Sequence, residues 1–134
     1  MRLFKGPINL SVLILVLIIL VILAALFFAY VNAQAIAHDR RRLQDVEQIQ
    51  AALKIYYDEN GFYPASSNGM PKDIETYLSF WPVPPKPEGN CTKEDNQYAY
   101  TLRPGNDYWL TFCLAGSVGN LPAGEHQASS KGIQ

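Results

Sequence analysis

The fold is decided by residues 42–64, which read RLQDVEQIQAALKIYYDENGFYP. Apolar side chains recur every three or four positions through the first part of this stretch, so they share one face of a helix. The positions between them are largely Gln, Glu and Lys, which predicts an amphipathic helix that carries other parts of the domain on its apolar side. The side chains expected to form this helix–sheet contact are Leu43, Val46, Ile49, Leu53 and Tyr56.

The same stretch contains the signal that ends the helix. Asn60 and Gly61 form a C-terminal stop, because glycine adopts the left-handed conformation that other residues resist. Phe62 can fold back onto the last turn, and Tyr63 is biased toward extended geometry because it precedes Pro64. We therefore predict that the helix ends at Asn60 and that an aromatic side chain packs against its end.

Toward the N-terminus the chain becomes apolar on every side. Residues 12–31 read VLILVLIILVILAALFFAYV, with no polar group except the Tyr30 hydroxyl. About twenty helical residues span the ~30 Å hydrocarbon core of a bilayer, and transfer of these side chains favours insertion by roughly 5–10 kcal/mol. We expect residues 10–31 to be a membrane-spanning helix, with Val12, Leu20 and Val31 in the apolar region.

A cleaved secretory signal is the alternative for this segment. Arg2 and Lys5 form a basic N-terminal region, and residues 33–35 read Ala-Gln-Ala, which would place cleavage after Ala35. The apolar run is longer than the ~7–15 residues usual in a signal peptide. We therefore prefer a retained membrane helix.

The cysteines bear on orientation. Cys91 and Cys113 are the only two in the chain, and such a pair in a small extracytoplasmic domain is more often a disulfide than a metal site. Basic residues flank both ends of the apolar run, so the positive-inside rule alone does not decide. The expected disulfide favours an N-terminus in the cytoplasm and a C-terminal domain outside.

Two strands are expected after a long loop. Residues 97–103 and 108–114 alternate apolar and polar side chains, and residues 104–106, Pro-Gly-Asn, form a turn between them. A three-residue loop places all the apolar side chains of both strands on one face, whereas a two- or four-residue loop scatters them. The expected pairs are Tyr98 with Phe112, Tyr100 with Leu110, and Leu102 with Tyr108.

The resulting fold class is α+β, with a long N-terminal helix whose second half packs against a small antiparallel sheet. The expected segments are a short cytoplasmic leader-like segment (1–9), the membrane helix (10–31) and an extracytoplasmic domain (32–134). Within that domain we expect an amphipathic helix (32–60), a loop (61–96) with a short helix over 72–80, a β-hairpin (97–114) and a tail (115–134). The tail offers one candidate edge strand, which the sequence does not place.

The residues do not suggest catalysis. His38 and His126 are far apart in sequence and no serine has a paired base, so we expect neither an enzyme nor a bound cofactor. A zinc site formed by Cys91, Cys113 and His126 is an alternative, although its spacing matches no usual pattern. The aromatic residues of the hairpin favour a core and sheet surface over a ligand platform. Residues 58–134 carry five basic and nine acidic side chains, which argues against nucleic-acid binding through the bulk surface.

This layout and the motif in residues 42–64 resemble type IV pilins, and most specifically the major pseudopilin of type II secretion and related bacterial subunits. In that family the helix carries Arg, Asp, Ile, Ala-Leu and Tyr, and closes on Asn-Gly-x-Tyr-Pro. Residues 81–87 followed by Tyr98 and Tyr100 also resemble the family's proline-containing loop, with Lys86 where Asp is common. The matching positions are Arg42, Asp45, Ile49, Ala52, Leu53, Tyr56 or Tyr57, Asn60, Gly61, Tyr63 and Pro64.

The resemblance implies a structural subunit that acts by helix bundling in a pilus, a secretion pseudopilus or a DNA-uptake filament. Its partners would be the lipid bilayer, other pilin-like subunits, and an assembly platform with its ATPase. Its location would be the bacterial cytoplasmic membrane or a surface or periplasmic filament. Some pseudopilins hold Ca²⁺ in a loop near the sheet, and the corresponding candidates here are Asp95, Asn96 and Asp107, for which solvated turn residues are the alternative.

The N-terminus departs from the family pattern. Arg2, Lys5 and Gly6 resemble the basic leader that a dedicated peptidase removes, but Pro7 follows the candidate cleavage point, and proline there lacks an N–H. Ser11 stands where the family has a Glu that pairs with the terminal amine of a neighbouring subunit. These differences support an alternative: a permanently anchored pilin-like binding or adhesion module that does not polymerise.

Overall fold

Residues 9–134 are described by a computed structural model, in which the chain divides after Gln34 into two units. The leader-like features at Arg2, Lys5, Gly6 and Pro7 lie outside the described residues. The helix α1 is assigned to Leu10–Asn60 and therefore contributes to both units, which we describe one at a time.

The first unit contains the apolar part of α1. The Asn9 carbonyl accepts hydrogen bonds from the amides of Val12 and Leu13 at 2.8 and 3.2 Å, so the helix starts where expected. Every side chain in residues 10–31 is exposed in the isolated chain. By length and composition this part of α1 is long and apolar enough to cross a membrane.

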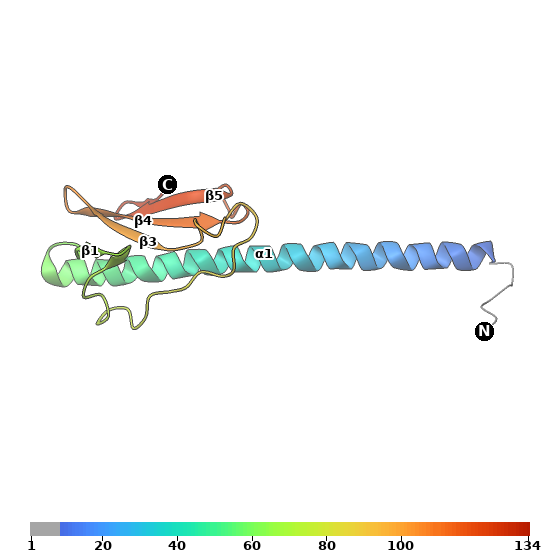
Figure 1. The fold of residues 1–134 in the computed structure, drawn as a ribbon, viewed down its shortest axis with the longest axis horizontal. Helices are drawn as coiled ribbons and strands as arrows, with labels where there is room; N and C mark the ends of the chain where they lie inside the picture. Colours follow the sequence, from blue (N-terminus) through green and yellow to red (C-terminus); the bar gives the residue numbers. More distant parts are fainter. Residues whose placement is uncertain (1–8) are drawn as a thin grey trace. The chain divides into compact units, whose positions relative to one another are not determined.

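The second unit pairs the remainder of α1 with an antiparallel sheet of four strands in the order β3-β4-β5-β6. Figure 1 shows β3, β4 and β5 lying along the C-terminal half of α1. The strands are β3 (Ala99–Arg103), β4 (Asp107–Leu114), β5 (Gly124–Ser129) and β6 (Gly132–Ile133). The observed class is therefore α+β, as predicted.

The expected hairpin register is confirmed where both strands are regular. Tyr100 pairs with Leu110 and Leu102 with Tyr108, and the connection is the three residues 104–106. The strands differ slightly in extent from the prediction: β3 begins at Ala99 and β4 at Asp107, so Tyr98 precedes the paired residues and its predicted pairing with Phe112 lies outside the observed register. Leu102 differs in burial as well: its position at the tip of the hairpin leaves 38% of it exposed.

The tail contributes more to the sheet than one candidate edge strand. Residues of β5 pair with β4, as in Leu110 with Ala128 and Phe112 with His126. The short β6 then pairs with β5, through Ala128 with Ile133. The sequence did not predict β5 because its residues are mostly polar, although three of the six, His126, Ala128 and Ser129, are buried.

The core lies between the predicted apolar face of α1 and the sheet. Val46, Ile49 and Leu53 are fully buried, while Leu43 and Tyr56 are partly buried and pack against the same cluster. The predicted helix–sheet contact is therefore confirmed. Tyr98, just before β3, joins the same cluster. The sheet contributes Tyr100, Tyr108, Leu110, Phe112, Leu114 and Ala128.

The loop after α1 differs from the prediction in one respect. Residues 72–80 form turns and not a regular helix, although the amides of Tyr77 and Leu78 both donate to the Ile74 carbonyl. Asp73 has a φ of 57°, and this left-handed residue is incompatible with the first turn of a helix. The prediction of a short helix was therefore wrong.

A small hairpin precedes these turns. The strands β1 (Ser66–Ser67) and β2 (Met70–Pro71) pair across a turn at Asn68 and Gly69, whose φ angles are 52° and 75°. It covers part of the outer edge of β3: the Tyr100 amide donates to the Gly69 carbonyl at 2.7 Å. The Ser66 hydroxyl donates to the Tyr100 carbonyl at 2.9 Å.

Candidate functional site

The end of α1 closes as the sequence predicted. Gly61 has a φ of 78°, and the Asn60 side-chain amide donates to the Tyr56 carbonyl at 2.8 Å. Phe62 folds back so that its ring meets Tyr56 edge to face at 6.1 Å between centroids. Tyr63, which is nearly buried, stacks on Tyr57 at 4.7 Å.

The helix end is also tied to the sheet. The Tyr63 amide donates to the Asn106 side-chain oxygen at 3.0 Å, and the Asn106 side-chain amide donates to the Gly61 carbonyl at 3.2 Å. The Tyr100 hydroxyl donates to the Pro64 carbonyl at 2.7 Å. Asn106 lies in the turn of the β3–β4 hairpin, so the four-residue Gly-Phe-Tyr-Pro ending sets the position of that hairpin on the helix.

Two further tyrosines cross from the sheet to polar groups on α1. The Tyr98 hydroxyl donates to an Asp45 carboxylate oxygen at 2.8 Å, and the Tyr108 hydroxyl accepts from the Gln50 side chain at 3.3 Å. Burial raises the pKa of Tyr98, Tyr100 and Tyr108, in the case of Tyr108 to about 12. All three therefore stay protonated near neutral pH and act as core residues with a hydrogen-bonding end.

The unexpected feature of this interface is a buried charged residue, Arg42. Its side chain is 1% exposed, and Nη1 donates to an Asp39 carboxylate oxygen at 2.9 Å. Nη2 donates to the Lys86 carbonyl at 2.9 Å and to the Asn96 side-chain oxygen at 3.2 Å. Among the described residues, Nε of Arg42 has no partner. Arg42 thereby connects α1 to the proline-containing loop.

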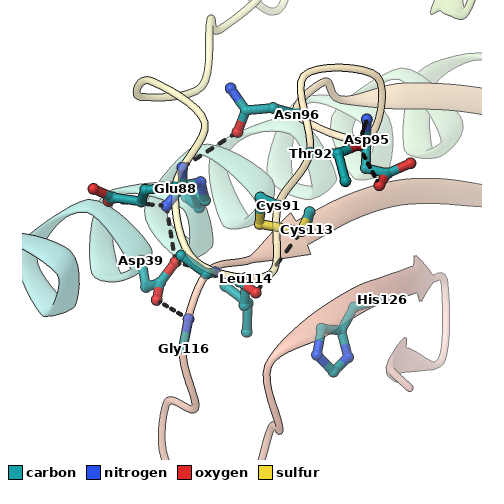
Figure 2. The surroundings of a disulfide bond; sticks show 12 residues. Asp39, Glu88, Cys91, Thr92, Asp95, Asn96, Cys113, Leu114, Gly116 and His126 are labelled. Atoms are coloured by element: carbon teal, nitrogen blue, oxygen red, sulfur yellow. Dashed lines mark hydrogen bonds and ion pairs between the residues drawn. A yellow bond between two sulfur atoms is a disulfide. The ribbon is translucent and has the colours of Figure 1, made fainter.

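Asp39 connects the same part of α1 to the sheet. Its carboxylate accepts hydrogen bonds from the amides of Ala115 and Gly116, each at 2.8 Å, just after the end of β4. Figure 2 shows Asp39 between the helix and this backbone, with Glu88 close by. Asp39 is only 2% exposed, so its charge is stabilised by these donors and by Arg42 and not by water.

A disulfide joins the proline-containing loop, which Arg42 contacts, to the end of β4, next to the residues that Asp39 contacts. Cys91 and Cys113 are bonded, with 22 residues of sequence separation, and both are buried. The predicted disulfide is therefore confirmed, and Figure 2 shows it between the loop and β4. Gly89 is required beside it: its φ is 55°, and a Cβ there would lie 2.4 Å from the Ala115 carbonyl oxygen.

The zinc alternative is wrong. Both thiols are consumed by the disulfide, and the nitrogens of His126 face the carbonyl oxygens of Pro122 and Gln134 at 2.8 and 3.2 Å. His126 belongs to the core side of the sheet, where its ring lies 5.6 Å from that of Phe112.

The three calcium candidates do not converge either. Asp95 pairs with the Thr92 hydroxyl at 2.6 Å, and Asn96 is engaged by Arg42. Asp107 lies opposite Arg103 in the strand register, at the far end of β3 from Asp95 and Asn96, and the four residue steps of β3 alone span roughly 14 Å. Burial alone would raise the pKa of Asp107, but hydrogen bonds from Tyr108 and Ser130 outweigh it and lower the pKa. Asp95 and Asn96 therefore act as loop residues, and Asp107 begins β4 with its carboxylate held by two backbone amides.

A surface hollow of about 570 Å³ lies between α1 and the β5–β6 turn and is lined in part by Lys54, Tyr57, Tyr63 and Lys131. Lys54 is paired with Asp58 at 2.7 Å, and this hydrogen bond raises the lysine pKa, so it stays cationic. On the outer face of the sheet, the Arg103 guanidinium covers Trp109 at 4.4 Å from its ring centroid.

Sequence reasoning missed the Arg42–Asp39 pair although a signal for it was present. Continuing the apolar stripe from Val46 toward the N-terminus in steps of three and four leads through Arg42 to Asp39, so both lie on the face that meets the sheet. A charged pair with this spacing on a buried face indicates an internal ion pair. The Arg42 position also belongs to the motif that resembles pilins, which marks it as more than a surface charge.

Comparison with known proteins does not assign the chain to a family. No model of a known protein family matches it, and neither a curated protein nor a solved structure gives a significant match. The resemblance of residues 42–64 to type IV pilins stays a prediction from sequence.

Proposed function

We propose that the chain is a pilin-like structural subunit of a type IV pilus, a type II secretion pseudopilus or a DNA-uptake filament. The observation that supports this most directly is the unequal covering of α1. From Asp39 onward its inner face is buried under the protein's own sheet, whereas residues 10–31 expose large apolar side chains on all sides. An uncovered apolar helix of this length requires lipid or other apolar helices around it.

In a subunit that moves from the membrane into a filament, the same helix must be stable in both environments. In lipid, residues 10–31 satisfy their backbone internally and present only apolar side chains. In a filament, the same side chains pack against those of neighbouring subunits. The function is therefore helix bundling without catalysis, with an assembly platform and its ATPase as further partners.

We place the N-terminus in the cytoplasm and residues 32–134 outside a bacterial cytoplasmic membrane. The Cys91–Cys113 disulfide supports this orientation, because such bonds persist mainly in oxidising compartments.

Photo-cross-linking of the full-length protein in its native membrane tests bundling. A benzoyl-phenylalanine placed at Ile18, in the uncovered part of α1, should produce a ladder of self-adducts, because each subunit can link to the next. The same photoreactive residue at Thr101, on the outer face of the sheet, controls for random collision. A monomer band alone at Ile18 would support the second candidate function.

That second candidate is a permanently anchored pilin-like binding or adhesion module. It is favoured by Ser11, which lies in α1 where the family pattern has a charge-pairing Glu, and by Pro7 after the candidate cleavage point. Intact mass of the native protein discriminates between them. A chain that begins at Pro7 supports processing and assembly into a filament. Retention of Met1, with no protein in sheared filaments, supports the anchored binding or adhesion module. A chain that begins at Ile36 would indicate a cleaved secretory signal.

A further inference from the structure

We propose that the end of the second unit at which α1 enters it binds the anionic headgroups of phospholipids through Arg40 and Arg41. This inference rests on the membrane anchoring proposed above and adds a preferred lipid class to it. It follows from how the structure distributes charged side chains at this end.

The acidic side chains here are turned inward or already paired. Asp39 is buried and shared between Arg42 and two backbone amides. Glu88 lies 2.6 Å from the His38 ring nitrogen and 3.8 Å from Arg42. Neither carboxylate is available to neutralise a charge on the surface.

The remaining basic side chains are turned outward. Arg40 and Arg41 are exposed, and within residues 9–134 neither takes part in an ion pair. Lys86 is also exposed, while its carbonyl is held by Arg42. Asp45, one turn beyond Arg41, accepts from the Tyr98 hydroxyl.

Figure 2 shows Asp95 on the opposite side of the disulfide from Asp39. Within residues 9–134 the guanidinium groups of Arg40 and Arg41 therefore have no ion-pair partner at this end. Asp45, whose carboxylate accepts from the neutral Tyr98 hydroxyl, offsets only part of their charge.

These arginines are close in sequence to the apolar segment. Val31 and Arg40 both belong to α1 and are nine positions apart, which corresponds to about 14 Å of helical rise. A long Arg side chain can extend along the helix toward the headgroup layer while its stem stays on apolar surface. Each basic residue near an anionic membrane surface contributes about 1 kcal/mol, or about fivefold in affinity.

Native mass spectrometry of the full-length protein, released from micelles with equimolar phosphatidylglycerol and phosphatidylcholine, tests the proposal. We expect phosphatidylglycerol to be retained at least fivefold more than phosphatidylcholine, and up to about 30-fold if both arginines act independently. Arg40→Gln combined with Arg41→Gln should lower the ratio at least fivefold, and any preference that remains is assigned to other basic residues near the apolar segment, such as Arg2 and Lys5. Because both side chains are exposed, the double variant should keep its disulfide and its thermal stability.

The matched control is Lys72→Gln with Lys131→Gln, which removes two exposed charges at other places in the same unit. Its lipid preference should equal that of the unmodified protein. Equal retention of both lipids, an unchanged preference in the arginine variant, or displacement of lipid by millimolar inorganic phosphate would each overturn the proposal. Flotation with pure phosphatidylcholine vesicles reports anchoring separately, so a failure of lipid preference is distinguished from a failure to enter the membrane.

Discussion

Replacing Arg42 by Met should destabilise the folded domain far more than an exposed arginine would. Methionine keeps an unbranched apolar stem but removes the 2.9 Å contact with Asp39 and the hydrogen bonds to the Lys86 carbonyl and Asn96. The Asp39 charge would remain buried with only its two backbone donors. Breaking one partner of a buried ion pair typically costs about 3–5 kcal/mol.

The effect should be visible in thermal unfolding of the full-length protein in detergent. For a unit of this size, 1 kcal/mol corresponds to about 4–5 °C, so Arg42→Met should lower Tm by roughly 12–25 °C. Near-ultraviolet circular dichroism can follow the transition, because the core is rich in tyrosine. Arg41→Met, at an exposed position, is the matched control and should shift Tm by no more than about 2 °C.

A double-mutant cycle separates the ion pair from the rest. Asp39→Asn combined with Arg42→Met leaves no buried charge at either position, so it should be less destabilised than the sum of the two single variants. A loss below about 1 kcal/mol for Arg42→Met, or strict additivity in the cycle, would refute the idea that a buried charge pair holds the loop and sheet to α1.

Three further predictions concern the same unit. Gly89→Ala should cost at least 1–2 kcal/mol more in unfolding free energy than Gly119→Ala. Both glycines have a left-handed φ, but of the two only Gly89 would bring a Cβ against backbone atoms. Equal losses in denaturant titrations would contradict this. Removing the disulfide by Cys91→Ser with Cys113→Ser should cost about 3 kcal/mol for its 22-residue separation, measured by the same titrations, and a loss near zero would exclude a stabilising role. Burial raises the pKa of Tyr108 to about 12, so the folding stability linked to its protonation is fully present below about pH 10 and is lost as the pH rises toward 12. In unfolding experiments, Tyr108→Phe should therefore lose less stability at alkaline pH than the unmodified protein. An identical dependence of unfolding free energy on pH would contradict the assignment.

Much of the fold follows from patterns that repeat along the chain. The spacing from Leu43 to Tyr56 predicted the packed face of α1, and the Asn60–Gly61 stop predicted its end, because both depend on local geometry. The register of β3 with β4 followed from requiring their apolar side chains to share a face. Local chemistry and core burial agree at these positions, so the sequence alone was sufficient.

The missed elements depend on contacts between distant parts of the chain. The strand β5 is polar and is held by pairing with β4, which no periodicity in residues 124–129 indicates. The contact of Asp39 with Ala115 and Gly116 spans 76 and 77 residues, and its donors are backbone amides that every residue carries. The β1–β2 turn at Asn68 and Gly69 is different, since Asn-Gly is a recognised hairpin signal that was present but not used.

The two edges of the four-stranded sheet affect how copies of the domain interact at high concentration. The outward backbone groups of Tyr100 on β3 are already occupied by the β1–β2 hairpin, and the opposite margin is the two-residue β6. Short or covered margins discourage one sheet from adding strands to another. Many copies held at high local density should therefore resist cross-β aggregation, so that side chains and not backbone ladders govern how the domains meet.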